Sequence, residues 1–99
     1  MEKLLETEDG CLWIENYISH LLDGVFIHWD VYKWTPSKVK YYKDLWNNFI
    51  VLRLKSKWKN IYALPPSPRE EKLIKMFGFI DTGLTMRGNK LLIYMPRNN

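Results

Sequence analysis

The stretch Val25-Phe-Ile-His-Trp-Asp-Val-Tyr-Lys33 decides the fold, because its side chains alternate between two sides of an extended chain. One side carries Val25, Ile27, Trp29 and Val31, and the other carries Phe26, His28, Asp30 and Tyr32. Both sides hold bulky residues. A strand with this pattern is typical of the middle of a sheet, so the sequence predicts a central strand covered on both sides.

A long helix is predicted directly after this strand. Thr35 can cap it, and Pro36 suits the first helical position, where a missing N–H costs nothing. Apolar residues then recur at helical spacing, at Val39, Tyr42, Leu45, Trp46, Phe49 and Leu52. Residues 49–55 could also form a strand after an Asn-Asn turn. We favour one helix over 36–55, because the apolar stripe passes through the two asparagines without losing phase.

Residues 12–23 are predicted to form another helix. Ile14, Ile18 and Leu21 recur at i, i+4 and i+7, which gives one apolar face. Gly24 follows directly and suits the left-handed position that ends a helix. The preceding residues 1–11 are expected to form a turn of helix and then a loop.

Four short elements are predicted after the long helix. Residues 60–64 are a short strand, Ser67 caps a helix over 68–77, and strands from residue 79 and over 89–94 form an antiparallel hairpin. The predicted order is helix, strand, helix, strand, helix, strand, strand. This order indicates an α+β fold on a mixed sheet, with parallel pairing where strands and helices alternate.

Length and composition limit the class of protein. The chain has 99 residues, which suits one domain, and its 46% hydrophobic content excludes wholesale disorder. It has no apolar run near the ~20 residues that span a bilayer, and its acidic start does not resemble a signal peptide. Cys11 is the only cysteine, which excludes an intrachain disulfide. We therefore expect a cytoplasmic protein without membrane association.

Charge is distributed unevenly along the chain. Residues 1–30 hold seven acids and one base, whereas residues 33–59 hold eight bases and one acid. Two interpretations are open. The two segments can lie side by side and neutralise each other, or the second segment can form a basic face for an anionic partner.

The basic segment also contains aromatic residues, and this combination is the strongest candidate site. We expect the partner-binding residues to be Lys33, Trp34, Lys38, Tyr41, Lys55, Lys57, Trp58 and Lys59. Exposed rings among lysines can anchor a protein partner. They can also stack on bases while the lysines contact phosphates, or they can simply belong to the packing of the domain.

Other reactive side chains are few. His28 has Asp30 two residues away on the same side of its strand, which suggests an oriented base, a buried hydrogen-bonded pair or a contact with a partner. His20 is expected near the surface. Cys11 has acidic neighbours in sequence, which do not favour a nucleophilic thiolate. Two histidines without ligand spacing do not predict a metal site.

The segment from Lys72 to Phe79 reads Lys-Leu-Ile-Lys-Met-Phe-Gly-Phe, and it is followed by Ile80-Asp-Thr-Gly and then Lys90-Leu-Leu-Ile-Tyr-Met. A short helix ending in Gly-Phe before a closing hairpin resembles the C-terminal end of the GNAT acyltransferase fold. The resemblance covers roughly residues 25–95, and the short GNAT-like proteins of tailed phages are the most similar in kind. It implies a truncated GNAT-like mixed sheet.

The same resemblance implies a site for acetyl-CoA, and this chain departs from it in three places. Catalytic members hold the pyrophosphate in a glycine-rich loop after the central strand. The matching residues 33–38 contain no glycine, and Pro36 lacks an N–H. Ile74 stands where many members have a tyrosine that protonates the leaving thiolate, and Ser67 stands where an asparagine is common.

These departures favour a small phage accessory protein that binds a host or virion protein, without catalysis, cofactor or metal. Two alternatives stay open. One is a minimal acyl-CoA-dependent N-acyltransferase, in which Thr35, Ser37 and Lys38 would hold acetyl-CoA. The other is a nucleic-acid-binding module that uses the same basic–aromatic residues. Location in the host cytoplasm or in the virion follows from the phage resemblance.

Overall fold

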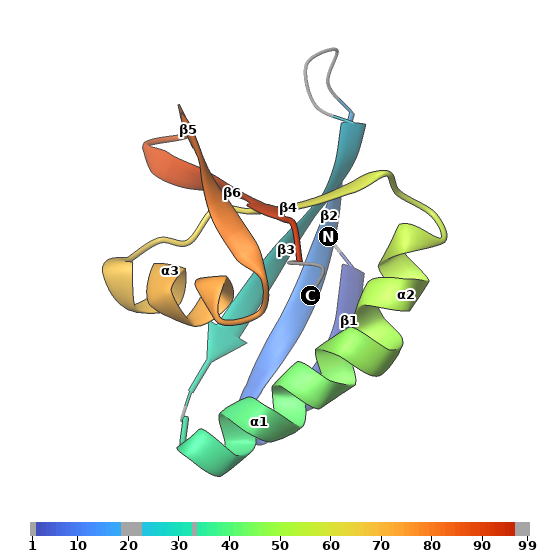
Figure 1. Cartoon of the computed structure of the whole chain (residues 1–99), viewed down its shortest axis with the longest axis vertical. Helices are drawn as coiled ribbons and strands as arrows, with labels where there is room; N and C mark the ends of the chain where they lie inside the picture. The colour runs from blue at the N-terminus through green and yellow to red at the C-terminus, as the bar shows by residue number, and fades with distance from the viewer. Residues whose placement is uncertain (1, 19–22, 33, 97–99) are drawn as a thin grey trace.

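The strand β3 (Asp23–Val31) lies inside a six-stranded sheet, in a computed structural model that describes residues 2–18, 23–32 and 34–96. The strand order across the sheet is β1-β2-β3-β4-β6-β5 (Figure 1). The other strands are β1 (Glu2–Thr7), β2 (Gly10–Ile18), β4 (Asn60–Ala63), β5 (Phe79–Met86) and β6 (Asn89–Tyr94). Val25, Phe26 and Ile27 are all buried, which confirms the prediction of a central strand for this half of β3.

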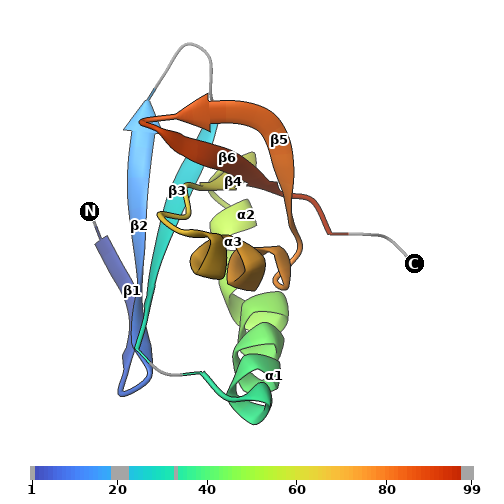
Figure 2. The same ribbon diagram turned by 90° about the vertical axis from the view of Figure 1, so that its left-hand side faces the viewer.

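The sheet is mixed, as predicted. β3 pairs parallel to β4, whereas the β1–β2, β2–β3, β4–β6 and β5–β6 pairs are antiparallel. The helices α1 (Pro36–Leu45), α2 (Val51–Lys55) and α3 (Pro68–Lys75) lie on one side of the layer formed by β1–β3 (Figure 2). The α+β class and the mixed sheet are therefore confirmed.

The predicted helix over 12–23 is wrong, and so is the turn of helix before it. Residues 2–7 and 10–18 form the antiparallel hairpin β1–β2, and β2 pairs with β3 from Gly10 to Ile18 without a break in register. Leu12 and Ile14 face the main core, so the apolar spacing that suggested a helix also satisfies a two-residue period. The pairing of β2 with β1 and β3 makes this segment a strand, and such pairing cannot be inferred from the local sequence. The observed order therefore starts with three strands.

Gly24 has a different role from the predicted helix end. It lies in β3, opposite Asn60 of β4. A Cβ atom at this position would be 2.4 Å from the Asn60 carbonyl oxygen. The glycine therefore permits the close approach of the two parallel strands.

One continuous helix over 36–55 is confirmed, and the alternative strand over 49–55 is wrong. The Thr35 hydroxyl accepts a hydrogen bond from the Lys38 N–H, and Pro36 occupies the first turn. Between α1 and α2, residues 46–50 form the π-helical turn η1 (Trp46–Ile50), in which the Val51 N–H donates to the Trp46 carbonyl.

This π-helical turn changes which residues face the core. A π turn contains one residue more than an α-helical step, so the apolar stripe moves by one position after Trp46. Val51 and Leu54 are buried, whereas Phe49 and Leu52 are 67% and 64% exposed. The prediction that Phe49 and Leu52 belong to the buried stripe is therefore wrong, although Tyr42 and Trp46 are buried as expected.

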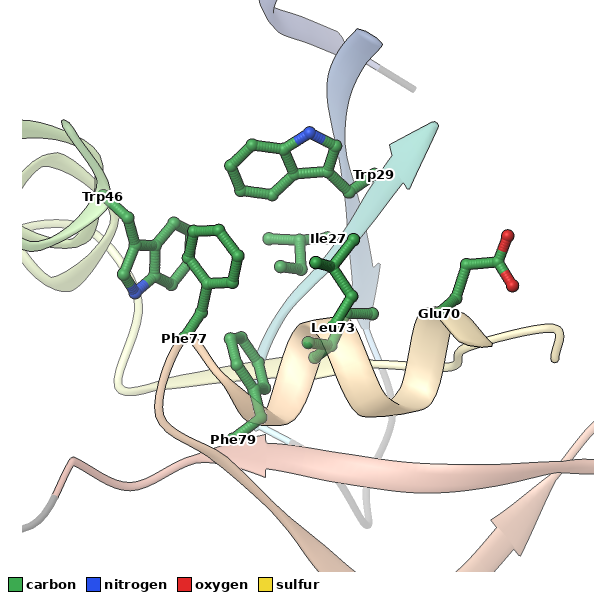
Figure 3. A pocket seen from close by; sticks show the side chains of 8 residues that line it. Ile27, Trp29, Trp46, Glu70, Leu73, Phe77 and Phe79 are labelled. Atoms are coloured by element: carbon green, nitrogen blue, oxygen red, sulfur yellow. The ribbon is translucent and has the colours of Figure 1, made fainter. Parts of the chain in front are cut away.

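Aromatic rings fill the core between the long helix and α3. Trp46 is completely buried, and its ring centroid lies 5.5 Å from that of Tyr94 and 6.3 Å from that of Phe77. Figure 3 shows Trp46, Phe77 and Phe79 gathered around the small space that Leu73 and Ile27 also line. Its volume is only about 10 Å³, so the core is well filled.

The elements after the long helix agree with the predictions in type and order, although α3 ends at Lys75 and not at residue 77. Ser67 caps α3 by accepting a hydrogen bond from the Glu70 N–H, and the hairpin β5–β6 closes the sheet. Gly78 has a φ of +101°, and the Tyr94 ring would lie 2.9 Å from a Cβ atom there. A glycine is therefore required where α3 turns into β5.

Candidate functional site

Among the described residues, a wide concave space lies where β3 and β4 diverge. Their pairing ends at Ile27 and Ala63, where β4 itself ends, but β3 continues to Val31. The resulting space, here called the β3–β4 cleft, has a volume of about 460 Å³. Its polar lining residues are His28, Asp30, Tyr32, Glu70, Arg87 and Asn89. Crevices beyond the carboxyl ends of parallel strands are common ligand sites.

The cleft exposes a free edge of β3. The Tyr32 N–H donates to the Asp9 carbonyl at 2.9 Å, so the backbone groups of Tyr32 are directed toward β2. N–H and C=O groups alternate in direction along a strand, so those of Trp29 and Val31 are directed toward the β4 side. Since the β3–β4 ladder has ended there, no backbone partner among the described residues pairs with Trp29 or Val31.

Glu70 has an unusual environment at the wall of this cleft. Ser67 and Glu70 have the spacing of a capping box, in which the glutamate would accept a hydrogen bond from the Ser67 N–H. Among the described residues the carboxylate makes neither that bond nor any ion pair, and its Oε2 is buried without a partner. Figure 3 shows it at the margin of the aromatic core, on the first turn of α3. An unpaired buried carboxylate oxygen is costly, so this placement calls for an explanation.

His28 does have a carboxylate partner, but it is Glu15 and not Asp30. His28 Nε2 and Glu15 Oε2 are 3.1 Å apart, and both side chains are about 30% exposed. Glu15 on β2 and His28 on β3 are diagonal neighbours in the antiparallel register. The pairing with Asp30 was the wrong inference, and Glu15 was missed because residues 12–23 were assigned to a helix.

The start of α1, where the resemblance would place acetyl-CoA, is occupied by the protein's own groups. The Lys38 ammonium bonds to the Asp9 carboxylate, which also accepts a hydrogen bond from the Tyr42 hydroxyl at 2.9 Å. The bond to Asp9 raises the pKa of Lys38, and burial raises the pKa of Tyr42. Thr35 and Ser37 hydroxyls are 3.2 Å apart. The turn between β1 and β2 therefore supplies an anion at the place where a pyrophosphate would lie.

The predicted basic–aromatic residues lie in different environments. Tyr41 is 61% exposed, as expected. Trp34 and Trp58 are half-buried and contact the core, so neither is a freely exposed ring. Lys33 lies outside the described residues.

The lysines at the far end of the long helix make local contacts. The Lys57 ammonium lies 4.9 Å from the Trp58 ring centroid, and the Lys55 ammonium donates to the Lys59 carbonyl at 2.9 Å. Lys55, Lys57 and Lys59 are all exposed, and none forms an ion pair within the described part of the chain. The acidic N-terminal segment therefore neutralises only part of the basic segment. The Lys38–Asp9 ion pair is an example of this neutralisation.

A second surface feature was predicted only at Tyr41, and its other two residues, Phe49 and Leu52, were assigned to the core. Tyr41, Phe49 and Leu52 are all more than 60% exposed along the long helix, and we call them the outer helix face. Lys40 and Arg53, which are exposed next to these residues in sequence, form no ion pair among the residues that the structure describes. For Phe49 and Leu52 the signal in the sequence was the apolar stripe, which was assigned to the core because a π-helical turn cannot be inferred from spacing alone.

Cys11, His20 and possible metal ligands are the remaining candidates from the sequence. Cys11 is buried, and His20 lies outside the described residues. Within residues 2–18, 23–32 and 34–96, His, Cys, Asp and Glu side chains form no group of three that could hold a metal ion. The helices in that part of the chain are too short or too polar to cross a bilayer.

Comparison with known proteins gives no relative: no protein family, no curated protein and no solved structure matches this chain.

Proposed function

We propose that this chain is a GNAT-like accessory domain that binds a protein partner through the outer helix face and does not transfer acyl groups. The order strand, long helix, parallel strand, short helix and hairpin from β3 to β6 supports the GNAT resemblance. Gly78-Phe79 at the junction of α3 and β5 supports it as well. The resemblance to short phage proteins makes a host or virion protein the proposed partner.

The start of α1 supports binding rather than acyl transfer. A pyrophosphate site needs several free N–H groups at a helix start. Pro36 has none, the Lys38 N–H is bonded to Thr35, and the Lys38 ammonium is engaged by Asp9. Ile74, at the position where the resemblance expects a proton donor, is 7% exposed and cannot donate a proton.

The outer helix face is the observation that carries the proposal. Three large apolar side chains point into solvent along one helix, and exposed apolar groups of this kind mark interaction surfaces when they cluster. Lys40 and Arg53 beside them form no ion pair within the described residues, so the complementary partner surface is apolar at its centre and acidic at its rim. The acidic rim steers association, and the apolar contacts supply affinity.

The proposal is tested by capture with matched variants of the full chain. The double variant Phe49→Ser/Leu52→Ser removes two apolar side chains from the outer helix face. Leu84→Ser is the control, because Leu84 on β5 is 61% exposed and lies on the far edge of the sheet. We expect the natural chain and Leu84→Ser to retain the same acidic protein from a cell lysate and the double variant to lose it. Equal capture by all three chains would contradict the proposal.

A nucleic-acid partner would give a different result in the same experiment. Nuclease treatment would release it, and affinity for a short oligonucleotide would fall steeply with added salt because of counterion release. Removing two apolar side chains would change that affinity little. The half-buried positions of Trp34 and Trp58 disfavour base stacking, which is why the protein partner is preferred.

A further inference from the structure

We propose that the β3–β4 cleft binds an extended peptide segment, which adds to the free edge of β3 and places a basic side chain against Glu70. This inference concerns a second surface of the molecule and does not depend on the outer helix face. It rests on two independent observations, the unpaired backbone of β3 and the unpaired carboxylate of Glu70.

The backbone observation selects an extended chain. Trp29, which lines the cleft, and Val31 further along β3 direct their N–H and C=O groups toward the side where β4 would continue if the two strands had not diverged. A peptide added at a strand edge satisfies such groups through main-chain hydrogen bonds. β2 already covers the opposite edge of β3, so the peptide would complete the pairing on both sides. The cleft volume of about 460 Å³ lies within the range of about 300–1,000 Å³ usual for ligand sites.

The charges of the cleft select a basic side chain. Glu70 and Asp30 form no ion pair within the described residues, and the Glu70 Oε2 is buried without a hydrogen bond. The two basic side chains in the lining are already engaged, because His28 is bonded to Glu15 and Arg87 has an interaction of its own. The charge left without a partner in the β3–β4 cleft is therefore the negative charge of Glu70 and Asp30. Rotation about the last side-chain bond of Glu70 exchanges its two oxygens, so either can accept from an ammonium or guanidinium group.

Strand geometry also predicts the order of side chains in the peptide. Successive residues of an inserted strand would point to opposite sides of the sheet. On the helix side the peptide would meet Trp29, Glu70 and Ile74, which suit a basic residue with apolar residues two positions before and after it. On the other side it would meet His28 and Asp30, which suit polar residues. The pattern is apolar, polar, basic, polar, apolar.

The test adds each of two blocked pentapeptides, Val-Thr-Lys-Thr-Val and Val-Thr-Glu-Thr-Val, to the full chain. NMR measures the binding of each peptide and the amide hydrogen exchange of the chain. We expect the lysine peptide to slow amide hydrogen exchange of Trp29 and Val31 at least tenfold, and the glutamate peptide to bind at least tenfold more weakly. Glu70→Gln should weaken binding of the lysine peptide about tenfold or more. Glu71→Gln is the control on the same helix, since Glu71 pairs with Lys75 and Lys90, and it should bind like the natural chain.

Three results would overturn the inference. The first is absence of binding by the lysine peptide at millimolar concentration. The second is equal affinity for the two peptides or equal loss in both variants. The third is protection of the Trp29 and Val31 amides by acetyl-CoA instead of peptide, which would assign the cleft to an acyl carrier. None of these results bears on capture through the outer helix face, because the variants and probes leave Phe49 and Leu52 unchanged.

Discussion

Two leucines in the same helix should respond very differently to removal of their side chains. Leu52 and Leu54 lie on either side of Arg53 in α2, and they are 64% and 1% exposed. A regular α-helix continued from Tyr42 and Trp46 would bury Leu52. The π-helical turn at 46–50 reverses this, because its extra residue moves Val51 and Leu54 into the core. The pair Leu52→Ala and Leu54→Ala therefore tests the π-helical turn directly.

The expected magnitudes follow from burial. Truncating a fully buried leucine to alanine removes favourable transfer energy and leaves a cavity, which together cost about 2–5 kcal/mol. For Leu54→Ala we take about 3 kcal/mol, which lowers the melting temperature of a domain of this size by roughly 12–24 °C. Leu52→Ala changes an exposed side chain at a helical position, so its effect on the free energy of unfolding should stay within about 0.5 kcal/mol.

Urea unfolding, monitored by tryptophan fluorescence, measures both values, since Trp46 is buried and is the first residue of the π-helical turn. Unchanged slopes of the unfolding free energy against urea would show that both variants unfold from the same kind of native state. A cost for Leu52→Ala equal to or greater than that for Leu54→Ala would refute the register shift. The outer helix face would then have to be abandoned as well.

Three further changes test other parts of the structure. Gly24→Ala should lower the free energy of unfolding by about 1–3 kcal/mol, because the new Cβ would be 2.4 Å from the Asn60 carbonyl oxygen. An unchanged urea midpoint would contradict the close approach of β3 and β4. Asp9→Asn should lower stability by about 1–3 kcal/mol, since the carboxylate accepts from the Tyr42 hydroxyl and pairs with an ammonium; equal melting temperatures would show that this network contributes nothing. Burial raises the pKa of Tyr94, so its contribution is complete below the unfolded value of about 10 and is lost as the pH rises beyond it. Tyr94→Phe should therefore lose less stability than the natural chain between neutral pH and pH 11, as thermal melts at both pH values would show.

The second half of the fold could be predicted because its signals are local. Thr35-Pro36 and Ser67-Pro68 mark two helix starts through capping and a fixed φ, and both caps are formed. Gly78 marks the end of the last helix through a conformation that other residues avoid. Each of these residues acts within its own turn of chain, so the surrounding structure does not change its meaning.

The first half could not be predicted in the same way. Residues 12–18 satisfy both a helical and a two-residue period, and only their pairing with β1 and β3 distinguishes the two. Gly24 fitted a helix end locally, but its role is set by Asn60, far away in the sequence. Long-range pairing overrides weak local preference in such segments.

The candidate sites show the same division. The basic character of residues 38–59 was readable, but the exposed apolar residues among them were hidden by the π-helical turn. The β3–β4 cleft depends on where two strands stop pairing, which no local pattern reports. Glu70 did carry a readable signal, since Ser67 and Glu70 have capping-box spacing, but the direction of its carboxylate could only be known from the structure.

We propose that this fold serves binding and not acyl transfer, and the part of the proposal that excludes acyl transfer is supported by the contacts of Asp9 with Lys38 and Tyr42 at the start of the long helix. Calorimetric titration of the full chain with acetyl-CoA, beside a functional acyltransferase as positive control, tests it most directly. We predict no saturable heat up to millimolar acetyl-CoA. Saturable binding at micromolar concentration would contradict the account and would turn the search toward an acceptor amine.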